Sequence, residues 1–264
     1  MSTRAPRFFY AGESAVVVEF GDSIDMETNK RVQVLRKKIE SCSFPGFIET
    51  VPTYRSLAVY FNPLQAGPPE KLEALLLELS QNLEMSGAEE KELLIIPTCY
   101  GGEFGPDLDK VASRTGLSAD EVIRRHSAQD CYCYMLGFVP GYPYLGGMDP
   151  SLETPRLKEP REKIPVGSVG IGGKQTGIYT VESPGGWNLI GRTPLRMFDP
   201  DRPLRPGGTP AIFLNAGMWV RFSPIDAADF ELLAHQSVLP DWQPDIRKNK
   251  KATKEVIGDV PDGV

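Results

Sequence analysis

The stretch GSVGIGGKQTGIY, residues 167–179, decides how the second half of the chain is interpreted, because its glycines and lysine invite comparison with phosphate-binding loops. A nucleotide-binding P-loop requires a glycine at position 168 and a serine or threonine after Lys174, but the chain has Ser168 and Gln175 there. The dinucleotide-binding fingerprint also fails, because its third glycine would fall on Gln175. The glycines of this stretch therefore need another explanation.

Outward from this stretch, residues 131–222 show little helical periodicity. Short apolar runs such as SVGIG, IYTVES and AIFL alternate there with glycine and proline. Closely spaced short strands with turn signals predict a β-barrel or a β-sandwich. Two short helices are expected before this region, one near residues 107–114 and one that begins at the capping box Ser118-Ala-Asp-Glu121. Residues 226–236, DAADFELLAHQ, predict a helix that closes the region.

The first hundred residues follow the order strand, helix, strand, strand, helix, strand. This order predicts a split ferredoxin-like βαββαβ arrangement, with two helices on one face of a four-stranded antiparallel sheet. The apolar runs that predict strands are residues 14–20, 47–54, 56–61 and 91–97, and the helices are indicated by Val32, Leu35 and Ile39 and by the leucines between Leu72 and Leu83.

These patterns predict an α+β protein in three units. We expect an N-terminal α+β domain at residues 1–97 and a β-barrel domain at residues 98–240. The end of the chain, residues 241–264, has little apolar content and carries the basic cluster RKNKKATK, so we expect a flexible, solvated tail.

Composition narrows the classes of function. The chain has 264 residues and a net charge of −6, which argues against nonspecific nucleic-acid binding, because phosphate contacts need clustered lysine and arginine. No apolar run is long enough for a membrane span, and no segment resembles a signal peptide. Four cysteines without a CxxC pair and only two histidines argue against a structural zinc site. We expect a cytoplasmic protein with reduced thiols and no metal.

His126 is the first candidate for chemistry. On the predicted helix it lies one turn after Val122, so it shares the face that is directed at the core. Two roles remain open at this point. It can be a buried, hydrogen-bonded histidine that fixes the helix to the barrel, or it can act as a general acid or base.

Two further segments carry candidate binding residues. The loop GFVPGYPYLGG, residues 137–147, combines glycines, prolines and aromatic rings that could wall a binding site or simply turn a barrel corner. Residues 156–195 are rich in basic side chains, which could meet an anionic group or be ordinary surface charge, and Gln175 could bind an amide or a carboxylate. The cations are Arg156, Lys158, Arg161, Lys163, Lys174 and Arg192.

Several long strings in the same segments resemble one known family, the allophanate hydrolase subunit 1 family, also described as KipI-like or as the B subunit of 5-oxoprolinase. The resemblance covers nearly everything except the two ends of the chain. The strings, in chain order, are PTCYGGEFGPDL, GLSADEVIRRH, MLGFVPGYPYLGGMD, PREKIPVGSVGIGGKQTGIY and SPGGWNLIGRTP.

The resemblance implies a cyclophilin-like β-barrel after the N-terminal α+β domain. It also implies that the glycines of residues 167–177 let a barrel strand turn and approach a ligand closely. As a hypothesis from the resemblance, His126 moves a proton. The substrate-binding residues would be Gln175, Tyr179, Arg192, Lys174 and Tyr142.

The family also implies partners and a reaction. The chain would be the B subunit of an ATP-dependent 5-oxoprolinase, acting with a larger C subunit and with an A subunit to open the lactam of 5-oxoproline to glutamate. ATP, with Mg²⁺, would enter at the level of this complex. Two alternatives stay open: an inhibitor that binds a sensor histidine kinase, as KipI-like proteins are described, and a carboxyltransferase domain of the urea or allophanate type.

Overall fold

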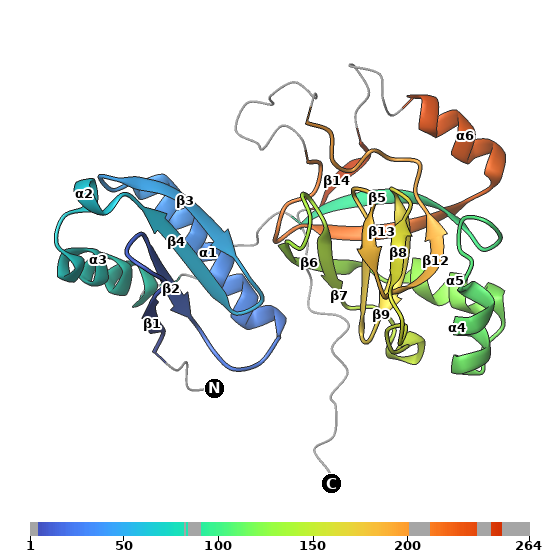
Figure 1. Cartoon of the computed structure of the whole chain (residues 1–264), viewed down its shortest axis with the longest axis horizontal. Coiled ribbons are helices and arrows are strands. Elements are labelled where there is room, and N and C mark those ends of the chain that lie inside the picture. Colours follow the sequence, from blue (N-terminus) through green and yellow to red (C-terminus); the bar gives the residue numbers. More distant parts are fainter. Residues whose placement is uncertain (1–4, 82, 84–90, 201–211, 237–243, 250–264) are drawn as a thin grey trace, which may run out of the picture.

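The computed structural model describes residues 5–81, 83, 91–200, 212–236 and 244–249, and it places the helices and strands in two parts (Figure 1). An N-terminal part with a four-stranded sheet lies beside a β-rich part that contains the rest of the described chain. The predicted mixed α+β class is confirmed. None of the helices in these ranges is long and apolar enough to cross a membrane.

The N-terminal part is an antiparallel sheet in the order β1-β2-β4-β3, with a core formed by one face of the sheet and two helices. Val16 and Val18 alternate with outward residues on one strand, and both are fully buried against helix residues such as Leu35 and Leu76. The elements are β1 (Arg7–Tyr10), β2 (Ala15–Glu19), α1 (Met26–Cys42), β3 (Phe47–Pro52), β4 (Ser56–Phe61), α2 (Pro63–Ala66) and α3 (Pro69–Gln81).

The predicted ferredoxin-like arrangement is wrong in its last strand. The fourth strand of the sheet is β1 at the start of the chain, and residues 91–97 instead belong to β5 (Lys91–Tyr100) in the other sheet. There β5 pairs in parallel with β13 (Trp219–Ile225). Long-range pairing with β13 explains the difference, because the apolar run Leu93 to Ile96 resembles the run Ala15 to Val18 of the N-terminal sheet and by itself suits either sheet.

The β-rich part contains a closed barrel, which confirms the predicted β-barrel. Strands β12, β9, β10, β7, β6, β13 and β5 follow one another, and pairing of Gly191 on β12 with Tyr100 on β5 closes the ring. Such a closed barrel is consistent with the cyclophilin-like expectation. The remaining strands of the ring are β6 (Cys131–Leu136), β7 (Pro143–Gly146), β9 (Ser168–Gly172), β10 (Gln175–Ile178) and β12 (Asn188–Arg192).

Helices and short strands surround the barrel. Both predicted short helices are present, and Ser118 caps the second one by accepting a hydrogen bond from the amide of Glu121. The predicted closing helix is α6. The elements are α4 (Leu108–Thr115), α5 (Ala119–Ala128), the 3₁₀ helix η1 (Pro150–Leu152), β8 (Arg161–Ile164), β11 (Ser183–Gly185) and α6 (Ala227–Gln236).

Part of the expected tail is a strand. Residues Ile246–Asn249 form β14, which pairs antiparallel with the first half of β5. Three of these four residues belong to the basic cluster, but Lys248 forms an ion pair with Glu92 across the ladder. Residues 241–243 and 250–264 of the predicted tail lie outside the described residues.

The glycine-rich stretch is the β9–β10 hairpin. Gly173 has a φ of 63° and occupies the first position of the two-residue turn, where glycine is favoured. A Cβ on Gly172 would lie 2.6 Å from the indole of Trp187, and one on Gly177 would lie 3.0 Å from the same ring. The expected turn is confirmed at Gly173, and Gly172 and Gly177 make room for Trp187, while the expected close approach to a ligand stays a prediction.

Asn29 of α1 joins the two parts of the molecule. It is fully buried, and its Nδ2 lies 2.9 to 3.1 Å from the carbonyl oxygens of Thr53, Tyr54 and Tyr134. Its Oδ1 accepts a hydrogen bond of 3.0 Å from the hydroxyl of Tyr132. Since Tyr132 and Tyr134 are on β6, one side chain links the helix, the β3–β4 turn and the barrel.

Replacing this asparagine tests its role. Asn29→Ala leaves buried carbonyls and a tyrosine hydroxyl without a partner, so we expect the free energy of unfolding to fall by about 2–4 kcal/mol. The measurement is urea unfolding at 25 °C. Asn215→Ala, at an exposed asparagine, is the control and should change stability by less than about 0.5 kcal/mol. Equal stabilities of the two variants would contradict the assignment.

Candidate functional site

His126 is enclosed by the barrel, with 1% of its surface exposed. Its Nδ1 lies 2.8 Å from the hydroxyl of Tyr100 on β5, and its Nε2 lies 2.8 Å from Oγ1 of Thr176 on β10. Its ring also packs on that of Phe222 on β13, with centroids 4.4 Å apart. His126 therefore ties α5 to three strands of the barrel.

The neighbours of His126 determine its protonation. The hydroxyl of Thr176 donates its single hydrogen to the carbonyl of Gly170, so it accepts from Nε2–H, and Nδ1 accepts from Tyr100. Burial lowers the pKa of His126 to about 3 and raises the pKa of Tyr100 well above its ordinary value. With both ring nitrogens in use inside the core, the geometry favours the packing role over the general acid or base.

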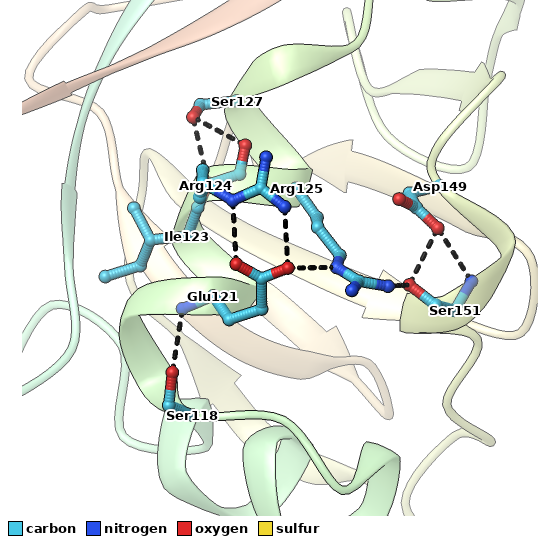
Figure 2. Close-up of polar contacts among 8 residues, drawn as sticks. All are labelled: Ser118, Glu121, Ile123, Arg124, Arg125, Ser127, Asp149 and Ser151. Atoms are coloured by element: carbon cyan, nitrogen blue, oxygen red, sulfur yellow. Dashed lines mark hydrogen bonds and ion pairs between the residues drawn. The ribbon is translucent and has the colours of Figure 1, made fainter.

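Polar contacts fix α5 in place on its outer side (Figure 2). Glu121 accepts hydrogen bonds from Arg124 and Arg125 at 2.6 to 2.7 Å, and these bonds lower the pKa of Glu121 to about 2. Arg125 also donates to Ser151 of η1 at 2.7 Å. The helix that carries His126 is thus held to η1 outside the core as well as to the strands inside it.

The buried histidine predicts a specific pH dependence of stability. The unfolded chain protonates this side chain near pH 6.5, whereas the folded protein resists protonation down to about pH 3. The contribution of His126 to the free energy of unfolding is therefore fully present above pH 6.5. Below that pH it is lost, by up to about 1.4 kcal/mol per pH unit. Chemical unfolding of wild type and His126→Gln between pH 7 and pH 4.5 should show a flatter profile for the variant.

His235→Gln supplies the control for that series. His235 is exposed on α6, so its replacement should leave the wild-type pH profile in place. If His126→Gln and wild type had parallel profiles, the histidine would be protonated in the folded protein and the packing role would be wrong.

A group of aromatic rings in edge-to-face contact lies on the other face of the β9–β10 hairpin. The ring centroid of Tyr142 is 5.1 Å from that of Tyr179, 5.3 Å from that of Tyr144 and 5.8 Å from that of Trp187. We call these four residues the aromatic cluster. Tyr142 and Tyr179 are each only 2% exposed, and burial raises the pKa of both. Tyr142 and Tyr179, two of the substrate-binding residues that the resemblance implies, are therefore neighbours in the structure. Because both are buried, they serve chiefly to pack this face of the hairpin.

Gln175 lies at the edge of this cluster and contacts the N-terminal part. The hydroxyl of Tyr54, in the β3–β4 turn, is 3.1 Å from Oε1 and 3.0 Å from Nε2 of Gln175. The ring of Tyr54 packs edge-on against Tyr144, with centroids 5.8 Å apart. A half-buried amide, a tyrosine hydroxyl and aromatic faces therefore meet where the two parts of the molecule touch.

The positive charge of Arg156 lies beside the aromatic cluster. The guanidinium carbon of Arg156 lies 5.7 Å from the centroid of the Trp187 ring. Burial raises the pKa of Tyr54, Tyr142 and Tyr179, and the positive charge of Arg156 opposes that shift in all three. An amide, hydroxyls, flat apolar faces and a cation are the groups that recognise a small planar polar ligand.

The other predicted binding residues do not all join this site. Lys174 is exposed in the hairpin turn next to Gln175. Arg192 pairs with Ser168 at the opposite end of β9, roughly 13 Å along the strand from Gly172, which pairs with Gln175. There Arg192 donates to the carbonyl of Glu103 and lies over the ring of Phe104. Its position separates it from the aromatic cluster.

Two more cations of the basic segment have structural partners. Arg161 forms an ion pair of 2.9 Å with the buried Asp107, which also accepts from the amide of Leu189 at 2.7 Å. Lys163 pairs with Glu182 at 3.1 Å on the surface. For these two side chains the ordinary role, in packing or at the surface, is the one the geometry favours.

Sequence reasoning missed Tyr54 and did not single out Trp187 or Tyr144. Tyr54 is far away in the chain, and only the docking of the β3–β4 turn brings it to Gln175. A usable signal did exist for Trp187, because a bulky ring often fills the space beside a run of glycines.

Comparison with known proteins now places the chain. The family of the carboxyltransferase domain, subdomain C and D, matches residues 6–206, so the chain belongs to that family. The resemblance in the sequence motifs is confirmed at the level of particular relatives as well. The chain is 40% identical to the 5-oxoprolinase B subunit of Bacillus subtilis (strain 168) over 239 residues, which cover 86% of this chain and 95% of that protein.

Further relatives agree with this placement. The 5-oxoprolinase B subunit of Escherichia coli O157:H7 is 39% identical over 220 residues, covering 83% of this chain and 95% of that protein. Among solved structures, TTHA0988 is similar with a TM-score of 0.71 and 34% identity over 81% of this chain. The match spans only 40% of the TTHA0988 chain, so that protein contains further polypeptide beyond the shared region.

Proposed function

We propose that this chain is the B subunit of an ATP-dependent 5-oxoprolinase, which acts with a larger C subunit and with an A subunit to open 5-oxoproline to glutamate. The observation that carries the proposal is the 40% identity to a 5-oxoprolinase B subunit across 95% of that protein's length. Identity over nearly a whole relative supports a shared role more strongly than a shared fold does.

The aromatic cluster with Gln175 supplies chemistry that suits a lactam. The side-chain amide of Gln175 has one donor group and one acceptor, which match the carbonyl oxygen and the N–H of a cyclic amide. Both of its polar atoms contact the Tyr54 hydroxyl, which can give up either contact when a ligand binds. In this proposal the chain binds and orients the lactam, while the ring of the ligand lies against Tyr54 and Tyr144, the two partly exposed tyrosines of the site.

ATP is assigned to the complex and not to this chain. An amide carbon is a poor electrophile. Transfer of the γ-phosphoryl group of ATP to the lactam oxygen would leave ADP and make that carbon more electrophilic. Water would then add, the C–N bond would break as the nitrogen takes up a proton, and a second water would release inorganic phosphate. The glycine-rich stretch does not fit a nucleotide phosphate, because Gly172 and Gly177 are covered by Trp187 and the backbone of the hairpin is engaged in strand pairing. We therefore derive no step in which residues of this chain contact ATP or Mg²⁺.

Reconstitution tests the proposal. The chain is co-expressed with the larger C subunit and the A subunit, and glutamate and ADP formation are measured with 5-oxoproline and Mg-ATP. We expect both products only when all three proteins are present. Turnover of a urea-derived amide instead would favour the carboxyltransferase alternative, and inhibition of a sensor histidine kinase without any amide turnover would favour the binding-type inhibitor.

Gln175→Leu tests the role of the amide in that mixture. Loss of hydrogen bonds to the lactam should raise KM for 5-oxoproline by about 3- to 10-fold, with smaller changes in kcat. Gln129→Leu, at the exposed end of α5, is the matched control and should leave KM unchanged. Size-exclusion chromatography should show the same complex for both variants. Failure of Gln175→Leu to assemble would make Gln175 a packing residue.

A further inference from the structure

The backbone on both sides of Arg156 is fixed by hydrogen bonds. The carbonyl oxygen of Pro155 accepts a hydrogen bond of 2.9 Å from Nδ2 of the buried Asn188. The amide of Leu157 donates to the carbonyl oxygen of Gly186 at 2.6 Å. Backbone order of this kind lowers the conformational entropy that a ligand-binding side chain loses when the ligand arrives.

The segment of Arg156 is also attached to the hairpin that carries Gln175. Thr154 and Gly173 form an antiparallel bridge, with backbone hydrogen bonds of 3.3 and 2.8 Å. The bridge fixes the segment of Arg156 against the turn of the hairpin, directly before Gln175. The indole of Trp187 that lies under Arg156 also covers Gly172, and Gly172 pairs directly with Gln175, so the cation and the amide lie beside the same ring.

The guanidinium has no carboxylate partner within the described part of the chain. Its side chain is exposed and lies over the ring of Trp187, which orients the flat group without neutralising it. By contrast, Arg161 and Lys163 of the same basic segment are each paired with an acidic side chain. An arginine that is fixed by its backbone and supported by the same ring that covers the hairpin of Gln175 is a preorganised receptor for an anionic group.

We propose that Arg156 binds the carboxylate of a small cyclic amide whose lactam group is held at Gln175, so that the site selects carboxylate-bearing lactams over neutral ones. This inference rests on the proposed function, since it takes 5-oxoproline as the ligand of the aromatic cluster. The planar fork of arginine matches a carboxylate with two parallel hydrogen bonds, which a lysine cannot reproduce.

The test compares Arg156→Met with Arg156→Lys in the reconstituted complex. For 5-oxoproline, Arg156→Met should raise KM at least about tenfold while kcat changes much less, and Arg156→Lys should recover part of the loss. For 2-pyrrolidinone, the lactam without a carboxylate, wild type and Arg156→Met should have the same KM. Lys158→Met removes an exposed cation two residues away and is the matched control, which should behave as wild type.

The outcomes separate this inference from the proposed function. If the wild-type complex turns over 5-oxoproline and Arg156→Met keeps its KM, the inference is wrong and the proposed function stands. If the wild-type complex shows no turnover, the proposed function fails, and calorimetric binding of 5-oxoproline to the complex decides the inference. Binding that is lost in Arg156→Met but not in Lys158→Met supports it, and absence of binding to wild type overturns it.

Discussion

The packing of the Trp187 indole on the β9–β10 hairpin is the interaction on which the candidate site depends. The ring occupies space that exists only because Gly172 and Gly177 have no side chains. From that position it also contacts Tyr142 and Arg156. Any side chain at either glycine would displace the ring, and with it the surface that supports both the tyrosines and the cation.

Successive side chains of strand β10 point to opposite faces of the barrel wall, so neighbours in the sequence lie in different surroundings. Thr176 and Ile178 face the main core, where Thr176 contacts His126, whereas Gln175 and Gly177 face the aromatic cluster. Adjacent residues therefore belong to different environments. The buried side contributes stability through satisfied hydrogen bonds, and the partly exposed side keeps polar groups accessible to a ligand.

Sequence reasoning reached the barrel, the helices and the region of the site for identifiable reasons. Short apolar runs separated by glycine and proline report strands directly, and the serine cap of α5 is a local signal. Such signals do not predict which sheet β5 joins. The run from Leu93 to Ile96 suits either sheet, and only long-range pairing with β13 decides between them. Likewise, no local sequence signal predicts that Arg192 donates to the carbonyl of Glu103, or that Arg156 lies over the ring of Trp187.

The contact between Tyr54 and Gln175 links the two parts of the molecule at the candidate site. A hairpin turn from one part supplies a hydroxyl to an amide of the other, and a displacement of an ångström would break a hydrogen bond of 3.0 Å. Asn29 holds that same turn through the carbonyls of Thr53 and Tyr54 while it also contacts the barrel. The buried asparagine thus fixes the turn from behind, and the geometry of the candidate site follows from a residue that no ligand would touch.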